Sequence, residues 1–192
     1  MADKGAAMLV ELRRSCIHGY AHSTVADYLN VPGFVSIERN VNGGAAEKFY
    51  IAEFTSTKLV KGGAARLIAL AGIVAECYAN DPVVSPQEIA DWISFDLFEL
   101  SPTSAALILA SDEGDVARCL EIVRTCWNDI TQNAAAHAAY LDPTSSTQTP
   151  SRVVIGVGSR PNANGSADAG PSVSFRLEYG CGAPNRHGNQ NQ

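Results

Sequence analysis

The chain has 192 residues, of which 46% are hydrophobic and 18% charged, and its formal net charge is −6. This balance is typical of a globular protein, and no stretch concentrates enough basic residues to indicate nucleic-acid binding. The N-terminus lacks the basic-then-apolar order of a signal peptide, and the longest apolar run, 67–79, is too short to span a bilayer. We therefore expect a soluble, cytoplasmic protein that binds neither nucleic acid nor membrane.

The order of apolar and turn residues predicts a mainly helical first part with one small β-hairpin. Helices are indicated by apolar residues at every third or fourth position and by start signals such as Ser85 before Pro86. The hairpin is indicated by β-rich runs on both sides of Asn42-Gly43-Gly44. The helices are expected over 6–29, 64–80, 87–97, 104–110 and 114–139, and the strands over 34–38 and 49–54.

The composition changes after Leu141, where Pro, Ser and Thr become frequent. Such a segment is typical of a linker. Beyond it, 153–157 and 173–179 are candidate strands, and the second alternates between apolar and polar residues. We therefore expect one domain over 1–141, followed over 142–192 by a linker and a flexible tail. The strand at 173–179 either occupies in cis the same sheet edge that a bound peptide would use or pairs with another subunit.

Two histidines, His18 and His22, lie four residues apart within the first predicted helix. Residues at this spacing share one face of a helix, one turn apart. The same spacing holds zinc in HExxH metallopeptidases, where the glutamate is the general base. Here Gly19 stands in the place of that glutamate. From these residues alone, the pair is either a zinc site that has lost its base or two ordinary core histidines.

The stretch from Leu9 to Leu29 resembles the motif helix of the FtsH-type zinc metallopeptidase domain. The strand 35–37, the turn at Gly43-Gly44 and the run Leu70-Ala71-Gly72-Ile73-Val74-Ala75-Glu76 are similar to the elements that follow in that family. The resemblance covers about residues 9–127 and implies a zincin-like α+β fold without the ATPase module of the family. In such domains two histidines and a later aspartate bind zinc, and a glutamate activates water.

The resemblance assigns the two histidines to zinc, but the chain departs from the family at two other positions. Gly19 supplies no general base, and the loss of such a group typically costs about 10²–10⁴-fold in rate. Ser104 stands where the aspartate ligand is expected, and a neutral serine is a poor ligand for zinc. Asp96 and Glu99 are the acidic residues that a shifted alignment would use, and both also fit a solvated acidic face.

Four further residues have predicted places. Glu76 is expected to support the site as a carboxylate that accepts a hydrogen bond from a histidine ring. Val35 and Ile37 belong to a strand whose edge would bind an extended peptide by strand addition. His137, near the end of the last predicted helix, is expected at the surface.

Three functions remain open from the sequence. The first is a degenerate zinc-metallopeptidase-like protein without proteolytic activity, which acts as a peptide or protein binding module and has zinc as its candidate cofactor. The second is an active zinc-dependent metallopeptidase that uses His18, His22 and an acidic third ligand such as Asp96. The third is a helical structural protein without metal. Glutamate restored at position 19 separates the second from the others, because it should create proteolysis if the rest of the site is intact.

Overall fold

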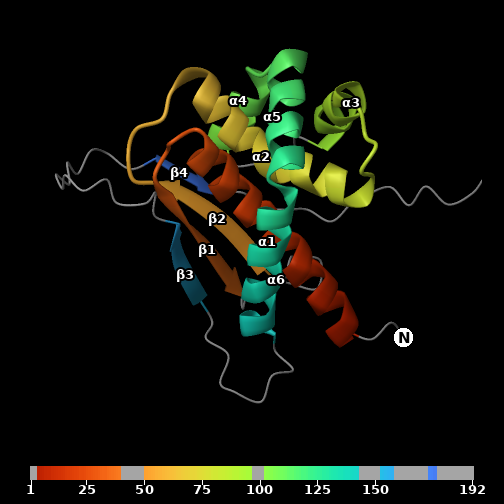
Figure 1. Ribbon diagram of the computed structural model, residues 1–192, viewed down its shortest axis with the longest axis vertical. Coiled ribbons are helices and arrows are strands. Elements are labelled where there is room, and N and C mark those ends of the chain that lie inside the picture. The colour runs from red at the N-terminus through yellow and green to blue at the C-terminus, as the bar shows by residue number, and fades with distance from the viewer. Residues whose placement is uncertain (1–3, 40–49, 97–101, 143–151, 158–172, 177–192) are drawn as a thin grey trace, which may run out of the picture.

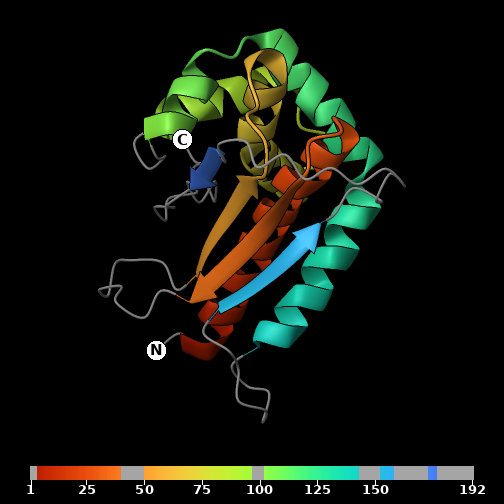
Figure 2. The ribbon, with the colours of Figure 1, turned by 90° about the vertical axis from the view of Figure 1, so that its left-hand side faces the viewer.

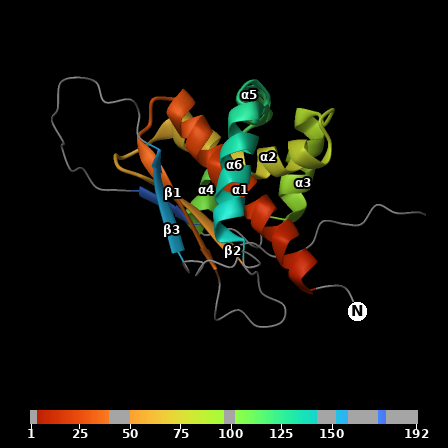
Figure 3. The same cartoon turned by 60° about the horizontal axis from the view of Figure 1, so that its bottom comes forward.

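The computed structural model describes residues 4–39, 50–96, 102–142, 152–157 and 173–176. In these ranges the chain forms a layer of helices against one face of an antiparallel sheet (Figures 1 and 3). The predicted mixture of many helices with a small hairpin is confirmed. The elements are the helices α1 (Lys4–Tyr28), α2 (Gly62–Asn80), α3 (Pro86–Asp96), α4 (Pro102–Leu109), α5 (Glu113–Thr125) and α6 (Trp127–Leu141), and the strands β1 (Gly33–Arg39), β2 (Tyr50–Ser56), β3 (Arg152–Val157) and β4 (Val173–Arg176).

Helix starts follow from local hydrogen bonds that the sequence encodes. At α3, the Ser85 backbone N–H donates to Glu88 Oε2 at 2.9 Å, and the Glu88 N–H donates to Ser85 Oγ at 3.2 Å. At α5, the Asp115 N–H donates to Asp112 Oδ1 at 2.8 Å. These reciprocal caps satisfy backbone donors that the first turn of a helix leaves without partners.

The helix predicted over 114–139 is two helices, α5 and α6, which meet in a turn at Cys126. Hydrogen bonding continues through the bend, because Cys126 N–H donates to Ile122 O at 2.9 Å and Ile130 N–H donates to Cys126 O at 3.1 Å. The bend lets α5 pack on α2 and α6 pack along α1. No Pro or Gly stands at this point, so tertiary packing rather than a local breaker accounts for the error.

The sheet has the order β3-β1-β2-β4, with every neighbouring pair antiparallel (Figure 2). The predicted hairpin forms its centre, and its turn at 42–44 lies outside the described residues. Both candidate tail strands join this sheet in cis: β3 pairs with the outer edge of β1, and β4 pairs with residues 53–56 of β2. The strand that begins at Val173 is therefore not at the edge beside Val35 and Ile37, which β3 occupies. The sheet is therefore wider than the predicted hairpin. Residues 177–179 of the predicted last strand lie outside the described part.

One face of the hairpin packs on the helices. Residues on β2 alternate, with Tyr50, Ala52 and Phe54 buried and their neighbours half-buried on the opposite face. On β1, Val35 and Ile37 are fully buried on the same face, and Ser36 between them is buried on the opposite face. The alternation on β2 is that of a sheet with one face toward the core.

Helix α1 lies at the centre of the fold, between the sheet on one side and α2 and α6 on the other (Figure 3). Helix α2 packs in turn between α1 and α5. Among the described helices, only α2 is long and apolar enough to cross a membrane by length and composition, and most of it is buried inside the fold. That burial is typical of a core helix.

Candidate functional site

The histidine pair occupies the contact between α1 and α2. His18 and His22 are 0% and 1% exposed, and their Nε2 atoms lie 2.8 Å apart. The other ring nitrogen of each contacts α2: His18 Nδ1 lies 2.8 Å from Glu76 Oε1, and His22 Nδ1 is hydrogen-bonded to the carbonyl oxygen of Ile68. Arg14 donates from Nε to the second carboxylate oxygen of Glu76. The pair is thus the middle of a buried polar chain that joins two helices.

Helical spacing explains how these groups meet. The residues that meet at this contact are at positions 14, 18 and 22 of α1 and at positions 68, 72 and 76 of α2. Residues four apart lie on one helical face, so two matching strips face each other. We call the side chains of Arg14, His18, His22 and Glu76, together with the Ile68 carbonyl, the buried polar chain.

Gly72 is the residue that lets the His18 ring rest directly on the backbone of α2. A Cβ atom at position 72 would lie 2.0 Å from Cε1 of this ring and 2.2 Å from its Nε2. Real Cβ atoms almost never approach other atoms closer than 3.0 Å. The glycine inside an otherwise apolar helix is therefore required by the position of His18.

Hydrogen-bond chemistry fixes most of the protons in the buried polar chain. A carbonyl oxygen only accepts, so His22 carries a hydrogen on Nδ1 and donates it to Ile68. Burial, followed by the charge of His18, lowers the pKa of His22 to about 3, so its ring is neutral and its Nε2 accepts. His18 must then donate from Nε2. One further proton is shared between His18 Nδ1 and the carboxylate of Glu76.

This proton count shows what the site is able to hold. If both rings donated from Nδ1, as metal-bound histidines do, the two Nε2 lone pairs would face each other 2.8 Å apart. Such an arrangement is stable only with a cation between the rings. Zinc with tetrahedral geometry separates two nitrogen ligands by roughly 3.3 Å, so the rings would move apart slightly. The site therefore holds either a hydrogen or, in its place, a metal ion.

The described residues do not complete a catalytic zinc site. No group of three or more His, Cys, Asp or Glu side chains within them is arranged to hold a metal ion. Ser104, at the position of the expected third ligand, is a fully buried residue of α4. Asp96 is the last residue of α3 and its side chain is outside the described part, as is Glu99. Of the predicted site residues whose side chains are described, the structure brings together His18, His22 and Glu76.

Gly19 faces the sheet. A Cβ atom at this position would lie 3.0 Å from Val35 Cγ1 and 3.3 Å from the Cβ of Ala52, with Ile37 Cδ1 at 3.9 Å. Successive residues of a helix point about 100° apart, so this position is turned away from the contact with α2. A glutamate here would direct its carboxylate among apolar side chains.

The edge of β1 that was predicted to bind a peptide is paired in the structure. Val35 and Ile37 point into the core, while the backbone of β1 bonds to β2 on one side and to β3 on the other. Strand addition at β1 therefore requires β3 to leave.

The prediction that His137 lies at the surface is wrong. Its side chain is 2% exposed, and its Nδ1 lies 3.1 Å from the hydroxyl of Tyr20. Burial raises the pKa of Tyr20 to about 12 and lowers the pKa of His137, so the phenol donates to a neutral ring. The error follows from the missed bend at Cys126, which lays α6 along α1. The spacing of His137 from the buried Ala134 and Leu141 is a helical signal that identifies its face.

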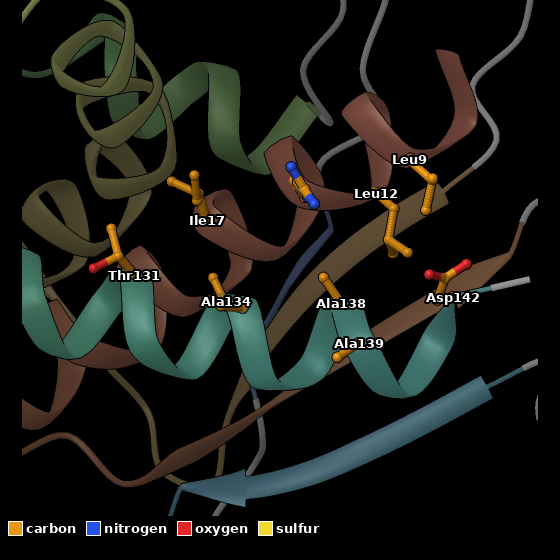
Figure 4. Close-up of a pocket in the computed structure, with 10 residues that line it drawn as sticks. Leu9, Leu12, Ile17, Thr131, Ala134, Ala138, Ala139 and Asp142 are labelled. Carbon is orange, nitrogen blue, oxygen red and sulfur yellow. The ribbon is translucent and has the colours of Figure 1, made fainter. Parts of the chain in front are cut away.

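A groove of about 310 Å³ lies between α1 and α6 (Figure 4). Leu9, Leu12 and Ile17 line it from α1, and alanines with Thr131 line it from α6. It is separate from the buried polar chain, because Ile17 and His18 lie on different faces of α1. The residues from α6 and its end are Thr131, Ala134, Ala135, Ala138, Ala139 and Asp142.

The stability of the protein is expected to fall as the pH falls below about 6.5, in part through His22. Its pKa is about 3 in the fold against 6.5 for the free group, so between these values only the unfolded chain takes up this proton. The free energy of unfolding then rises by up to about 1.4 kcal/mol per pH unit as the pH increases from about 3 to 6.5. Above pH 6.5 this rise is complete. When the free energy of unfolding in urea is plotted against pH from 4.5 to 7.5, its slope should be shallower for His22→Gln than for the wild type. Equal slopes would rule out this contribution.

Comparison with known proteins identifies no family for this chain. A scan against protein-family models gives no match, and a search of the curated proteins gives none either.

Proposed function

We propose that this protein is a zincin-like relative of the FtsH-type peptidase domain that lacks proteolytic activity and acts as a peptide or protein binding module. The order of elements supports the relationship: the helix with the two histidines, α1, is followed by the β1–β2 hairpin and by α2 with Glu76. The contact of Glu76 with His18 supports it further, because histidines that bind metal carry such carboxylate partners.

The observation that carries the loss of proteolysis is the packing of Gly19 on the sheet. Water activation in such a site needs a carboxylate beside the metal, and here position 19 supplies none and faces Val35 and Ala52 of the sheet. A catalytic zinc also keeps one position open to substrate. The rings of His18 and His22 are closed to solvent and bonded to α2 and to each other.

Restoring the glutamate tests this packing. Gly19→Glu should give no chelator-sensitive hydrolysis of casein or fluorogenic peptides, and should lower the free energy of unfolding by about 2 kcal/mol, because a carboxyl group is buried without a partner. Gly19→Ala is the matched control and should change stability by less than about 1 kcal/mol, since its helix propensity offsets a tight contact. A folded Gly19→Glu protein that hydrolyses peptides would show that the site is open. Zinc-dependent hydrolysis by the wild type would overturn the proposed function itself.

A second candidate function is metal binding without catalysis, in which His18 and His22 hold a divalent cation such as zinc. It is favoured by the two Nε2 atoms that face each other while both Nδ1 atoms contact α2. Protein purified without chelator or metal-affinity tag should then contain near-stoichiometric zinc by elemental analysis, and His22→Ala should contain none. An equal zinc content in both proteins, or none in the wild type, would remove this candidate.

A further inference from the structure

Strand β3 covers the edge of the hairpin that a bound peptide would use. It pairs antiparallel with β1 along residues 33–38, and β1 pairs with β2 on its other side (Figure 2). Strand addition joins backbone N–H and C=O groups of an extended peptide to such an edge. In this chain residues 152–157 already make that interaction.

The register places residues of matching character side by side. In an antiparallel pair, residues directly opposite each other share one face of the sheet and interact. Apolar residues of β3 stand opposite the two buried apolar residues of β1, and a basic residue stands opposite an acidic one. These pairs are Val35 with Ile155, Ile37 with Val153, and Glu38 with Arg152.

Among the described elements β3 packs on β1, and no other described element makes more than a marginal contact with it. β1, in contrast, packs on α1 and pairs with β2 as well. A strand with one neighbour opens at a lower free energy than the core, so β3 can leave while α1, β1 and β2 remain assembled.

We propose that the β1 edge is the partner-binding surface of this protein, that β3 covers it in cis, and that the partner is an extended peptide which replaces β3. The peptide repeats the pattern of β3, with apolar residues opposite Val35 and Ile37 and a basic residue opposite Glu38. This proposal rests on the proposed function as a peptide binding module. A tethered strand acts at an effective concentration of about millimolar, so it competes with the partner and weakens its apparent affinity.

The test measures binding of a fluorescent peptide with the sequence of residues 151–158, extended by lysines for solubility, to the full-length protein by anisotropy. Ile155→Pro should bind it at least about tenfold tighter than the wild type, because residue 155 stands at a hydrogen-bonded position opposite Val35 and proline there removes a ladder hydrogen bond. Phe175→Pro, which disturbs β4 in the same way at the other edge of the sheet, should bind like the wild type. Equal affinities of Ile155→Pro and the wild type, or no binding to either, would overturn the proposal.

A second variant guards against a general loss of structure in Ile155→Pro. Cysteines introduced at the paired positions Ser36 and Val154 allow a disulfide that fixes β3 on β1. The oxidised protein should lose peptide binding, and reduction should restore it. Binding that is unaffected by oxidation overturns the proposal. Such a failure concerns this edge alone, because hydrolysis by the wild type tests the proposed function without any of these variants.

Discussion

Gly72→Ala is expected to lower the free energy of unfolding by about 4 kcal/mol. The added Cβ would lie 2.0 Å from the ring of His18, which is fully buried and bonded to both Glu76 and His22. Overpacking of a core costs about 1–3 kcal/mol, and each buried hydrogen bond lost with the displaced ring adds about 1 kcal/mol. Urea or thermal unfolding measures the effect.

Two controls show whether the loss comes from this clash. Gly63→Ala, in the first turn of the same helix, meets only Arg66 Nη2 at 3.9 Å and should be neutral or slightly stabilising. In a His18→Ala background the Gly72→Ala change should cost far less, because the ring is gone. A similar cost in both backgrounds would mean that the ring of His18 does not lie on Gly72.

Glu76→Ala is expected to lower the free energy of unfolding by about 3–5 kcal/mol. The carboxylate is 4% exposed and contacts Arg14 and His18, and removal of one partner from a buried ionic group leaves the others unpaired. Glu76→Gln should cost less, because its amide is able to donate to a neutral His18. Chemical unfolding compares both variants with the wild type.

The matched control is the exposed ion pair of Arg118 with Glu121 on α5. Glu121→Ala should change stability by less than about 1 kcal/mol, since exposed pairs contribute little. If Glu76→Ala were as mild as Glu121→Ala, the buried polar chain would not stabilise the contact between α1 and α2.

Local sequence signals predicted most of the elements, because the chemistry that starts and ends them is local. Ser85 with Glu88 starts α3 as expected, and alternation identified the strand that begins at Val173. The bend at Cys126 was not predictable, since no residue there breaks a helix and the cause is packing on two different neighbours. Strand pairing across the sheet depends on distant segments, so the place of β3 beside β1 followed only from the structure.

The candidate site was predictable in part for the same reason. The spacing of His18 and His22 shows that they share one helical face, and that inference needs no tertiary information. A glycine inside a helix costs about 1 kcal/mol and indicates a close approach, but it does not name the neighbour. Gly19 proved to meet the sheet, and Gly72 proved to meet His18. Both facts depend on how α1 is placed between two layers.

Peptide binding without cleavage is tested by incubating the zinc-supplemented wild-type protein with a diverse peptide library and analysing bound and free peptides by mass spectrometry. We expect that a subset of intact peptides is retained and that no cleavage products form. Products that disappear with a chelator and with His18→Ala would contradict this expectation and establish an active metallopeptidase. Retention of no peptide at all would contradict the binding function.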